Sequence, residues 1–452
     1  MTFINQKSYI WVGAGLKQGR FICIPVNFKP LAFPKNSIKI FGLIILAAGG
    51  EMKKALLIFT GALLMLAAHA QASQKIISFE AAYRGGAMVK SIENIGGRVT
   101  KQFSIIDALV AVFPDSIKDA SIYSLPGVTH IDEDKYIKWI EEAPVSMTEK
   151  QLPTMEQAMD MIRTGEGWNA PVFSDIKPVV DPAEKEIPWG VKRVNASGAW
   201  NFTEGAGVKV AVIDTGMDYN HPDLKANYAG GYNAIAPTTS PLDDQGHGTH
   251  VSGTIGAARD SKGVVGVAPR VKLYAVKVLD KNGSGTYSNV VSGIEWAAQN
   301  KMDVINMSLG GTDSVEAMAK AVTAASIAGV TIVCAAGNNS GAVGYPAKYP
   351  ESIAISASDS GNKIASFSSR GAEIAFIAPG VDIYSTSKGG RYSTMSGTSM
   401  ASPHMAGLAA LAISAGAKNP AAVREALTKS ASSLGLKPTE EGAGMIDAAK
   451  LK

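Results

Sequence analysis

From Pro188 onward, short and almost uninterrupted apolar runs alternate with stretches of helical spacing. The apolar runs lie in VKVAVIDTG, KLYAVKVLD, DVINMSLGG, GVTIVCAAGN and SIAISASD, and the clearest helical stretches are SNVVSGIEWAAQNK and VEAMAKAVTAASIAG. Strands that are apolar on both sides are covered on both faces, and strands that alternate with helices become parallel neighbours. Residues 188–452 are therefore predicted to have an α/β fold, a doubly wound parallel sheet with helices on both faces.

Polar side chains follow three of these apolar runs, at the points where the expected strands end. Asp214 follows VAVI, Ser308 follows VINM and Asn338 follows VCAAG. Ligands of open α/β sheets bind outside the carboxyl ends of the strands. We therefore expect the functional site at this edge of the sheet.

One histidine and one serine have settings that suit chemistry at this edge. His247 lies between two glycines at the start of a helical stretch of small residues, and Ser399 lies in SGTSMASPHMAGLAALA. Amide hydrolysis by a hydroxyl needs a serine, a base, a carboxylate that orients the base, and donors for the oxyanion. The chain order Asp214, His247, Ser399 is one of the orders in which such triads occur. By spacing alone, structural roles for the aspartate and the histidine remain open.

A series of longer segments is more specific than these single residues. In chain order they are VAVIDTG, HGTHVSGTIGA, GVAPRVKLYAVKVLDKNGSGTYSNVVSGIEWA, DVINMSLGG, AAGN, ASFSSRG, IAPGVDIYST and SGTSMASPHMAG. Together they closely resemble the secreted bacterial subtilisins, from about Ile187 to the C-terminus. The resemblance implies a serine endopeptidase in which Ser399 is the nucleophile and His247 is the general base and then acid. It also implies that Asp214 orients His247 and that Asn338 belongs to the oxyanion hole.

The resemblance further implies that a polypeptide substrate binds as an extra strand between two backbone segments, and main-chain recognition of this kind gives broad specificity. Those segments are Gly283-Ser284-Gly285 and Ser308-Leu309-Gly310. The pocket for the residue before the cleaved bond matches Ala335, Ala336, Gly337 and Gly344, and it leaves room for a large apolar side chain. A second pocket, for the side chain three residues upstream, matches Tyr287, Val290 and Leu309, with plain core packing as the alternative. Asn339 stands where many relatives carry a carboxylate, so we expect little attraction for Lys or Arg.

Structural calcium is a further implication of the resemblance. The loop of residues 257–265 keeps the length of the family's calcium loop. Carboxylates would come from Asp223 and Asp260, and carbonyl oxygens from Ala258, Lys262 and Val264, which together form a hard oxygen shell. One position departs from the pattern, because Lys185 stands where the family has a glutamine ligand. The alternative is a polar hairpin with ordinary charges.

The front of the chain carries most of its basicity. Residues 1–54 hold eight basic and one acidic side chain, or +7, so the rest of a chain of net charge +4 sums to −3 and shows no footprint for nucleic acid. Residues 52–70 have two lysines, a short apolar stretch and Ala68-His69-Ala70, the order of a signal peptide. The apolar stretch of 14 residues is too short to span a bilayer. We expect Met52 to be the true start and residues 1–51 to be a mis-annotated leader; a long signal from Met1 is the alternative.

Residues 74–140 differ from the large domain. Their pattern predicts a small α/β sandwich of β-α-β-α-β order, which resembles, more weakly, the inhibitory propeptide of the subtilisins. The resemblance implies a folding template and intramolecular inhibitor that is removed by self-cleavage near Ile140. Residues 141–187 are rich in Glu, Pro, Met and Asp and are expected to be a linker.

The expected product is a secreted monomer without a membrane anchor after signal cleavage, and whether it is extracellular or periplasmic stays open. With only Cys23 and Cys334, we expect no disulfide and a buried thiol at Cys334. Two other functions remain as alternatives. One is a catalytically inactive binding protein of the same fold, and the other is a processing protease for one partner.

Overall fold

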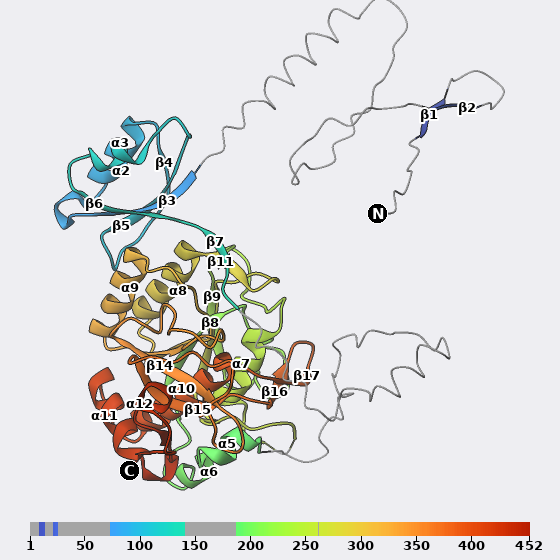
Figure 1. Ribbon diagram of the computed structural model, residues 1–452, viewed down its shortest axis with the longest axis vertical. Coiled ribbons are helices and arrows are strands. Elements are labelled where there is room, and N and C mark those ends of the chain that lie inside the picture. Colours follow the sequence, from blue (N-terminus) through green and yellow to red (C-terminus); the bar gives the residue numbers. More distant parts are fainter. Residues whose placement is uncertain (1–8, 14–20, 26–72, 141–186, 261) are drawn as a thin grey trace, which may run out of the picture. The chain divides into compact units, whose positions relative to one another are not determined.

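The structure, a computed structural model, describes residues 9–13, 21–25, 73–140, 187–260 and 262–452 (Figure 1). It divides into two units, residues 1–69 and residues 70–452. In the first unit, β1 (Tyr9–Gly13) pairs antiparallel with β2 (Phe21–Pro25). The expected signal peptide and all of the expected linker except Ile187 lie outside the described residues. No described helix combines the length and the apolar character needed to cross a bilayer.

A sheet of seven strands forms the centre of residues 187–452, in the order β15-β14-β13-β12-β8-β10-β9. The strands are β8 (Lys209–Asp214), β9 (Tyr228–Asn233), β10 (Lys272–Lys277), β12 (Val304–Met307), β13 (Thr331–Ala335), β14 (Ser352–Ser358) and β15 (Ile374–Pro379). Every neighbouring pair is parallel. The chain starts at β8, forms β9 at one edge, places β10 between β9 and β8, and then crosses to β12 on the other side of β8. The predicted doubly wound parallel sheet is therefore confirmed, with its switch point at the carboxyl end of β8.

Helices cover both faces of this sheet, and the strand residues alternate between them. Val210 and Val212 belong to the core beneath one set of helices, whereas Ala211 and Ile213 belong to the core beneath the other. The first set is α7 (His247–Gly256), α10 (Thr398–Ser414) and α11 (Pro420–Ser430); the second is α8 (Tyr287–Gln299) and α9 (Glu316–Ile327) (Figure 1). Because both faces are buried, the strands need the continuous apolar runs seen in the sequence.

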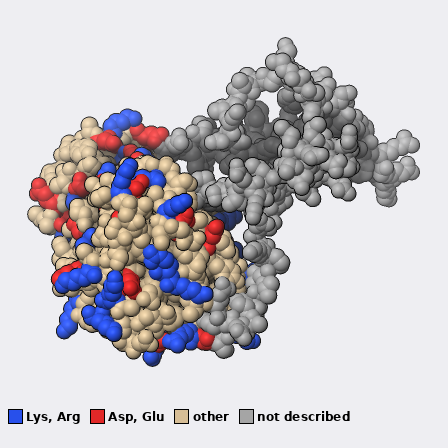
Figure 2. All heavy atoms as spheres, turned by 60° about the horizontal axis from the view of Figure 1, so that its bottom comes forward, with Lys and Arg blue, Asp and Glu red and all other residues tan. Residues whose placement is uncertain are grey.

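Short elements complete this part of the chain. The hairpin of β16 and β17 is antiparallel, as is the small ladder of β18 and β19. These elements are α5 (Trp189–Arg193), α6 (Ala196–Ala199), β11 (Ser284–Thr286), β16 (Ile383–Ser387), β17 (Arg391–Met395), β18 (Ala431–Ser432), α12 (Pro438–Glu441), β19 (Met445–Ile446) and η3 (Ala448–Lys450). On the face shown in Figure 2, positive and negative side chains lie interspersed among uncharged surface.

Residues 73–140 form an antiparallel sheet of order β4-β5-β3-β6 with two short helices. The elements are β3 (Ser73–Phe79), η1 (Ala81–Tyr83), α2 (Ala87–Asn94), β4 (Arg98–Gln102), β5 (Ala108–Phe113), α3 (Asp119–Tyr123), β6 (Val128–Glu133) and β7 (Tyr136–Lys138). The expected β-α-β-α-β order is therefore wrong in two places. Strand β4 was missed because none of its residues is buried, so no apolar run marks it. The expected last strand is two strands, and the second, β7, leaves this sheet to pair with β11.

Candidate active site

Asp214 and His247 meet at the switch point of the sheet. Asp214 is the last residue of β8 and is fully buried, and His247 is the first residue of α7. The ring Nδ1 of His247 donates to Asp214 Oδ1 at 2.8 Å and lies 3.0 Å from Oδ2. A second donor, the backbone N–H of Thr215, binds the same Oδ1 at 2.7 Å. The carboxylate thus fixes both the tautomer and the orientation of the imidazole.

The electrostatics of this pair favour a positively charged imidazole. Burial lowers the pKa of His247, but the charge and the hydrogen bond of Asp214 outweigh it, and the pKa is raised above 6.5. The other ring nitrogen, Nε2, is buried and has no hydrogen-bond partner among the described residues. A base with one nitrogen anchored and the other unoccupied can take a proton and hold it.

Ser399 lies at the start of α10, where its backbone differs from that of an ordinary helix residue. The helix begins at Thr398, and Pro403 lies in its second turn. Because Pro403 has no N–H to donate to the carbonyl four residues back, the Ser399 carbonyl is available to Ser308 Oγ, which donates to it at 2.8 Å. Ser399 Oγ in turn donates to the Ser308 carbonyl at 3.1 Å. Ser402 Oγ points away and donates to Asn306 Oδ1 at 2.8 Å.

Asn338 follows β13 and is held from one side. Its Oδ1 accepts from the backbone N–H of Thr398 at 2.8 Å and from the Thr398 hydroxyl at 2.9 Å. With Oδ1 engaged in this way, the amide nitrogen faces Gly397 and Ser399. A Cβ on Gly397 would lie 3.4 Å from Asn338 Nδ2. The side chain therefore has its donor beside Gly397, two residues before the serine.

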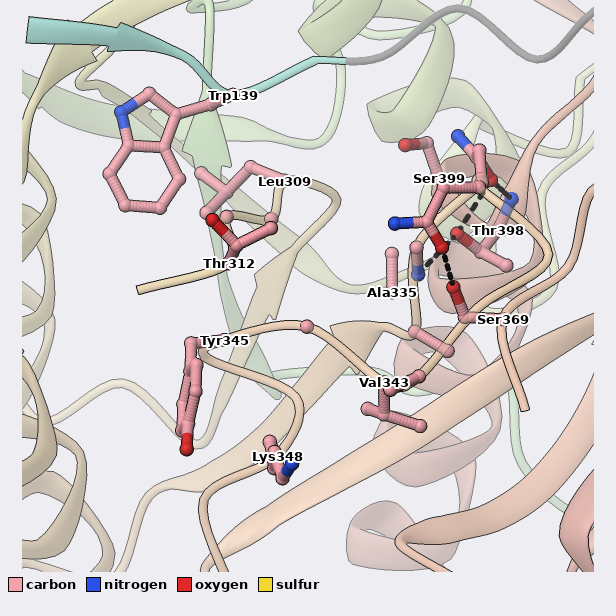
Figure 3. A pocket seen from close by; sticks show the side chains of 18 residues that line it. Trp139, Leu309, Thr312, Ala335, Val343, Tyr345, Lys348, Ser369, Thr398 and Ser399 are labelled. Carbon is pink, nitrogen blue, oxygen red and sulfur yellow. Dashed lines mark hydrogen bonds between the residues drawn. The ribbon is translucent and has the colours of Figure 1, made fainter. Parts of the chain in front are cut away.

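A cavity of about 240 Å³ lies beside Ser399 (Figure 3). Six of the residues expected to bind substrate line it: Leu309, Gly310, Ala335, Ala336, Gly337 and Gly344. A Cβ on Gly344 would lie 2.9 Å from the carbonyl oxygen of Gly311, so only glycine fits there without a shift of the backbone. The cavity is large enough for an aromatic or long apolar side chain. Thr312, Tyr345 and Lys348, which the sequence did not single out, also line it.

The groove beside this cavity contains a strand of the chain itself. Strand β7 pairs antiparallel with β11, with Ile137 opposite Gly285. The next residue after β7, Trp139, donates its backbone N–H to the Gly283 carbonyl at 3.0 Å and accepts from the Gly310 N–H at 3.1 Å. Its indole donates to the Gly285 carbonyl at 2.9 Å and meets the Tyr287 ring edge-on at 5.0 Å between centroids. Residues 136–139 therefore lie between the two backbone segments expected to hold a peptide. Val290 is fully buried in the core below.

Comparisons with known proteins agree with this geometry. Residues 205–445 match the model of the subtilase family. The chain is 44% identical over 313 residues to subtilisin E of Bacillus subtilis strain 168, which covers 67% of this chain and 78% of that protein. The chain belongs to the subtilase family. Other relatives are a subtilisin of Bacillus pumilus, 49% identical over 56% of this chain and 94% of its own, and Subtilisin Savinase of Lederbergia lenta, 45% identical over 58% and 98%.

Membership of the subtilase family confirms two predictions made from the sequence. The fold is that of the subtilisins, and the enzyme is a serine endopeptidase of the subtilisin type that acts on polypeptides. These comparisons concern the whole domain, and the roles of single residues are argued below.

In this subtilase the residues expected to bind calcium lie in the loop of residues 257–265, except for Asp223, which contacts this loop. Asp223 is 2% exposed, and its Oδ2 accepts from the Val264 N–H at 2.8 Å. The carboxylate packs against Gly263, which has φ +72°, and a Cβ there would lie 2.2 Å from Oδ2. Asp260 is exposed, and its Oδ1 accepts from the Lys262 N–H at 3.1 Å. The backbone N–H of Ala258 donates to the Asp223 carbonyl at 2.8 Å. Lys185 lies outside the described residues.

Thr398 and Trp139 also contact this subtilase site and were not found from the sequence. For Thr398, which orients Asn338, the sequence offers no indication of this role other than its position directly before Ser399. Trp139 was not singled out, because the pattern placed it within the expected last strand of residues 74–140. A large aromatic residue beside the expected cleavage position was the one signal that could have identified it.

Proposed function

We propose that the protein hydrolyses peptide bonds with Asp214, His247 and Ser399 as its triad. The observation that carries the proposal is the anchored imidazole at the switch point, whose Nδ1 donates to a buried carboxylate while its buried Nε2 has no hydrogen-bond partner among the described residues. His247 Nε2 takes the proton of Ser399 Oγ as the oxygen attacks the substrate carbonyl. The imidazolium then gives that proton to the leaving amine as the C–N bond breaks, and a water activated by His247 releases the acyl group from Ser399 Oγ. Asp214 stabilises the imidazolium throughout.

The oxyanion that forms in this step needs donors already in place. Asn338 Nδ2 is one donor, and its orientation is supported by the two bonds that Thr398 makes to Oδ1. The backbone N–H of Ser399 is the other, because the first N–H groups of a helix have no acceptor within the helix. The positive end of α10 adds to the stabilisation of negative charge there.

We propose broad specificity with a preference for large apolar residues before the cleaved bond. The cavity beside Ser399 is uncharged apart from Lys348 at its edge. Asn339 Oδ1 accepts from Ser369 Oγ at 3.0 Å and from the Gly341 N–H at 2.9 Å, so this side chain orders the loop and offers no negative charge to a basic substrate. A panel of peptides that differ at this one residue is expected to favour Phe, Tyr and Leu over Lys and Arg. A tryptic preference would contradict the proposal.

We propose that residues 74–140 are an inhibitory propeptide, the C-terminal segment of which occupies the substrate groove until self-cleavage near Ile140. Pairing of β7 with β11 supports this, because it uses the main-chain bonds that a substrate strand would use. A second contact supports it away from the groove: Glu295 on α8 accepts from Ser104 Oγ at 3.0 Å and from the Ile105 N–H at 3.2 Å.

We propose structural calcium at the loop of residues 257–265. Within the described residues no cluster of three or more His, Cys, Asp or Glu side chains could hold a metal. The expected site has only two carboxylates, so backbone carbonyls must supply most ligands, and calcium accepts such a shell. Adding chelator is expected to lower the melting temperature of the Ser399→Ala variant and to leave an Asp223→Asn variant of it unmoved. An unchanged melting temperature in both would contradict the site.

We propose that the enzyme is exported by the signal at residues 52–70 and acts as a monomer outside the cytoplasm. N-terminal sequencing of the active protein tests this, because it locates both the signal cut and the end of the propeptide. Retention of residues 1–51 in the cell would contradict Met52 as the start.

A fluorophosphonate probe tests the central proposal. Such probes label a serine only when a base activates it. The probe is expected to modify Ser399 in the wild type, to leave Ser399→Ala unlabelled, and to label Ser402→Ala, which keeps the nucleophile and loses a packing hydroxyl. Labelling of another residue, or none in the wild type, would reject the triad.

A further inference from the structure

A second buried carboxylate lies close to the Asp214–His247 pair and has no role in the proposed chemistry. Asp243 precedes α7 by four residues and is 3% exposed. Its Oδ1 accepts from the N–H groups of Gln245 and Gly246 at 3.0 and 2.9 Å. Its Oδ2 accepts from the backbone N–H and the hydroxyl of Thr249 at 3.0 and 2.6 Å. A carboxylate with this many donors is held in one orientation.

This carboxylate substitutes for the missing cap of α7. The residue at the N-cap position, Gly246, has no side chain to accept from the first turn. Asp243 instead accepts from the amides of Gly246 and Thr249, which flank His247. The start of the helix, and with it the backbone of His247, is therefore tied to Asp243.

Thr215 connects Asp243 to the other member of the pair. Its hydroxyl donates to Asp243 Oδ1 at 2.9 Å and accepts from the Gly248 N–H at 2.9 Å. Its own N–H donates to Asp214 Oδ1 at 2.7 Å, and its carbonyl accepts from Lys277 Nζ at 2.7 Å. Every polar group of Thr215 is thus engaged, so a shift of Asp243 must move the end of β8.

The charge of Asp243 is maintained in spite of its burial. Burial raises the pKa of this carboxyl, but the hydrogen bonds from Thr249, Gly246 and Gln245 outweigh burial and leave the pKa below its usual value. Asp243 is therefore an anion at neutral pH. Its negative charge also favours the protonated form of His247.

We propose that Asp243 is a positioning residue for the reaction. Through Thr215 and the first turn of α7 it fixes Asp214 and His247 relative to each other, and its charge stabilises the imidazolium that forms during attack. This inference rests on the triad proposed above, and it adds a residue that does not touch the substrate. A misplacement of catalytic groups by about 1 Å is enough to lower a rate about a hundredfold.

The test compares Asp243→Asn with Asp244→Asn. Asp244 is the next residue, but its side chain is 52% exposed and pairs with Lys277 Nζ at 2.7 Å, so the control removes the same charge from the surface. In Asp243→Asn we expect kcat per fluorophosphonate-titrated site to fall about tenfold to a hundredfold, with KM nearly unchanged. The acid limb of the kcat/KM profile should move to lower pH. Asp244→Asn should leave kcat within about twofold, because Lys277 Nζ keeps its bonds to the Thr215 and Leu279 carbonyls, each at 2.7 Å.

Substitutions of Thr215 separate position from charge. Thr215→Val removes the hydroxyl at constant shape but keeps the Asp243 charge, so kcat should fall while the acid limb stays in place. Thr215→Ser restores the hydroxyl and should recover most of the lost rate. These variants also keep the proposal testable if Asp243→Asn does not fold.

A proton resonance gives a readout that does not depend on turnover. The proton between His247 Nδ1 and Asp214 is expected at low field in the NMR spectrum of wild type and of Asp244→Asn, and shifted or broadened in Asp243→Asn. If Asp243→Asn loses only thermal stability, with rate, acid limb and resonance unchanged, Asp243 is structural and the proposal is wrong. If the probe fails to label Ser399 even in the wild type, the triad itself is wrong.

Discussion

At the scale of single residues, the site is built from side chains in which nearly every polar atom has a hydrogen-bond partner. Asn338 illustrates this, because Thr398 binds its acceptor atom and so decides where its donor points. Preorganised donors of this kind cost no rearrangement when charge develops on the substrate.

Asn338→Ala is therefore expected to lower kcat by about 10²–10³ and to leave KM nearly unchanged, because the donor acts only when the oxyanion forms. Steady-state kinetics with a peptide anilide, normalised to titrated sites, measure both constants. A smaller loss is expected for Thr398→Val, which leaves Asn338 in place but less firmly held. If KM rather than kcat changed in Asn338→Ala, the side chain would bind the ground state and not the oxyanion.

At the scale of elements, close contacts decide how α5 and α10 pack. A Cβ on Gly190 of α5 would lie 2.3 Å from His404 Nε2 of α10, and His404 is fully buried. His404 cannot retreat easily, because its Nδ1 donates to the Met400 carbonyl at 2.8 Å.

Gly190→Ala is accordingly expected to destabilise the protein by about 1–3 kcal/mol, the range for overpacking in a core. Urea unfolding in the Ser399→Ala background, which prevents autolysis, measures the loss. Lys192→Ala on the exposed side of the same helix is the control and should stay within about 0.5 kcal/mol of the parent. Equal stability of the two variants would show that α5 moves aside at no cost.

A second prediction at the scale of elements concerns the segment that follows β7 and packs beside β11. The Trp139 side chain contributes the indole hydrogen bond and the contact with Tyr287, and Trp139→Ala removes both while the two backbone bonds remain, so it should weaken inhibition by the proposed propeptide. Activity is expected to emerge earlier during maturation of the full chain, followed with a fluorogenic peptide. Tyr123→Ala, which removes an exposed aromatic ring from α3, should mature on the wild-type schedule. A slower emergence for Trp139→Ala would mean that this contact serves folding more than inhibition.

At the scale of the whole molecule, buried histidines set the response to acid. Burial lowers the pKa of His250 to about 3 and that of His404 to about 4. The unfolded chain binds protons at these residues near pH 6.5, before the folded chain does, so stability falls as the pH drops through that window. The pKa of His247 is raised, so the stability that this residue contributes is fully present below pH 6.5. His247 therefore does not alter how the free energy of unfolding changes with pH in that range.

The free energy of unfolding of Ser399→Ala is therefore expected to decline between about pH 6.5 and pH 4.5. The slope should be at most about 3 kcal/mol per pH unit, the limit for two protons. Urea titrations at half-unit intervals measure it. A flat profile across this range would mean that neither histidine is neutral and buried in the folded enzyme.

The predictions from the sequence agree best with the structure where apolar runs recur along the chain. Continuous apolar runs identified five of the seven sheet strands, but not β9, whose YAGGYN holds two glycines, nor β15. Of the expected triad residues, Asp214 and His247 meet at the end of β8, and Ser399 bonds to Ser308 at the end of the neighbouring strand β12. Asp243 and Thr215 were missed because a buried polar network has no period along the chain. Only the fold brings the end of β8 and the start of α7 within hydrogen-bonding distance of each other.

The nucleophile proposed here lies at the start of a helix whose first fifteen residues, Thr398–Ala412, are all buried. Backbone amides in such an element exchange with deuterium only when the whole domain opens. A covalent probe of Ser399 consequently counts intact molecules as well as active ones. Loss of titratable serine during storage or heating would report global unfolding, and a simple chemical titration could replace spectroscopy as an assay of the folded fraction.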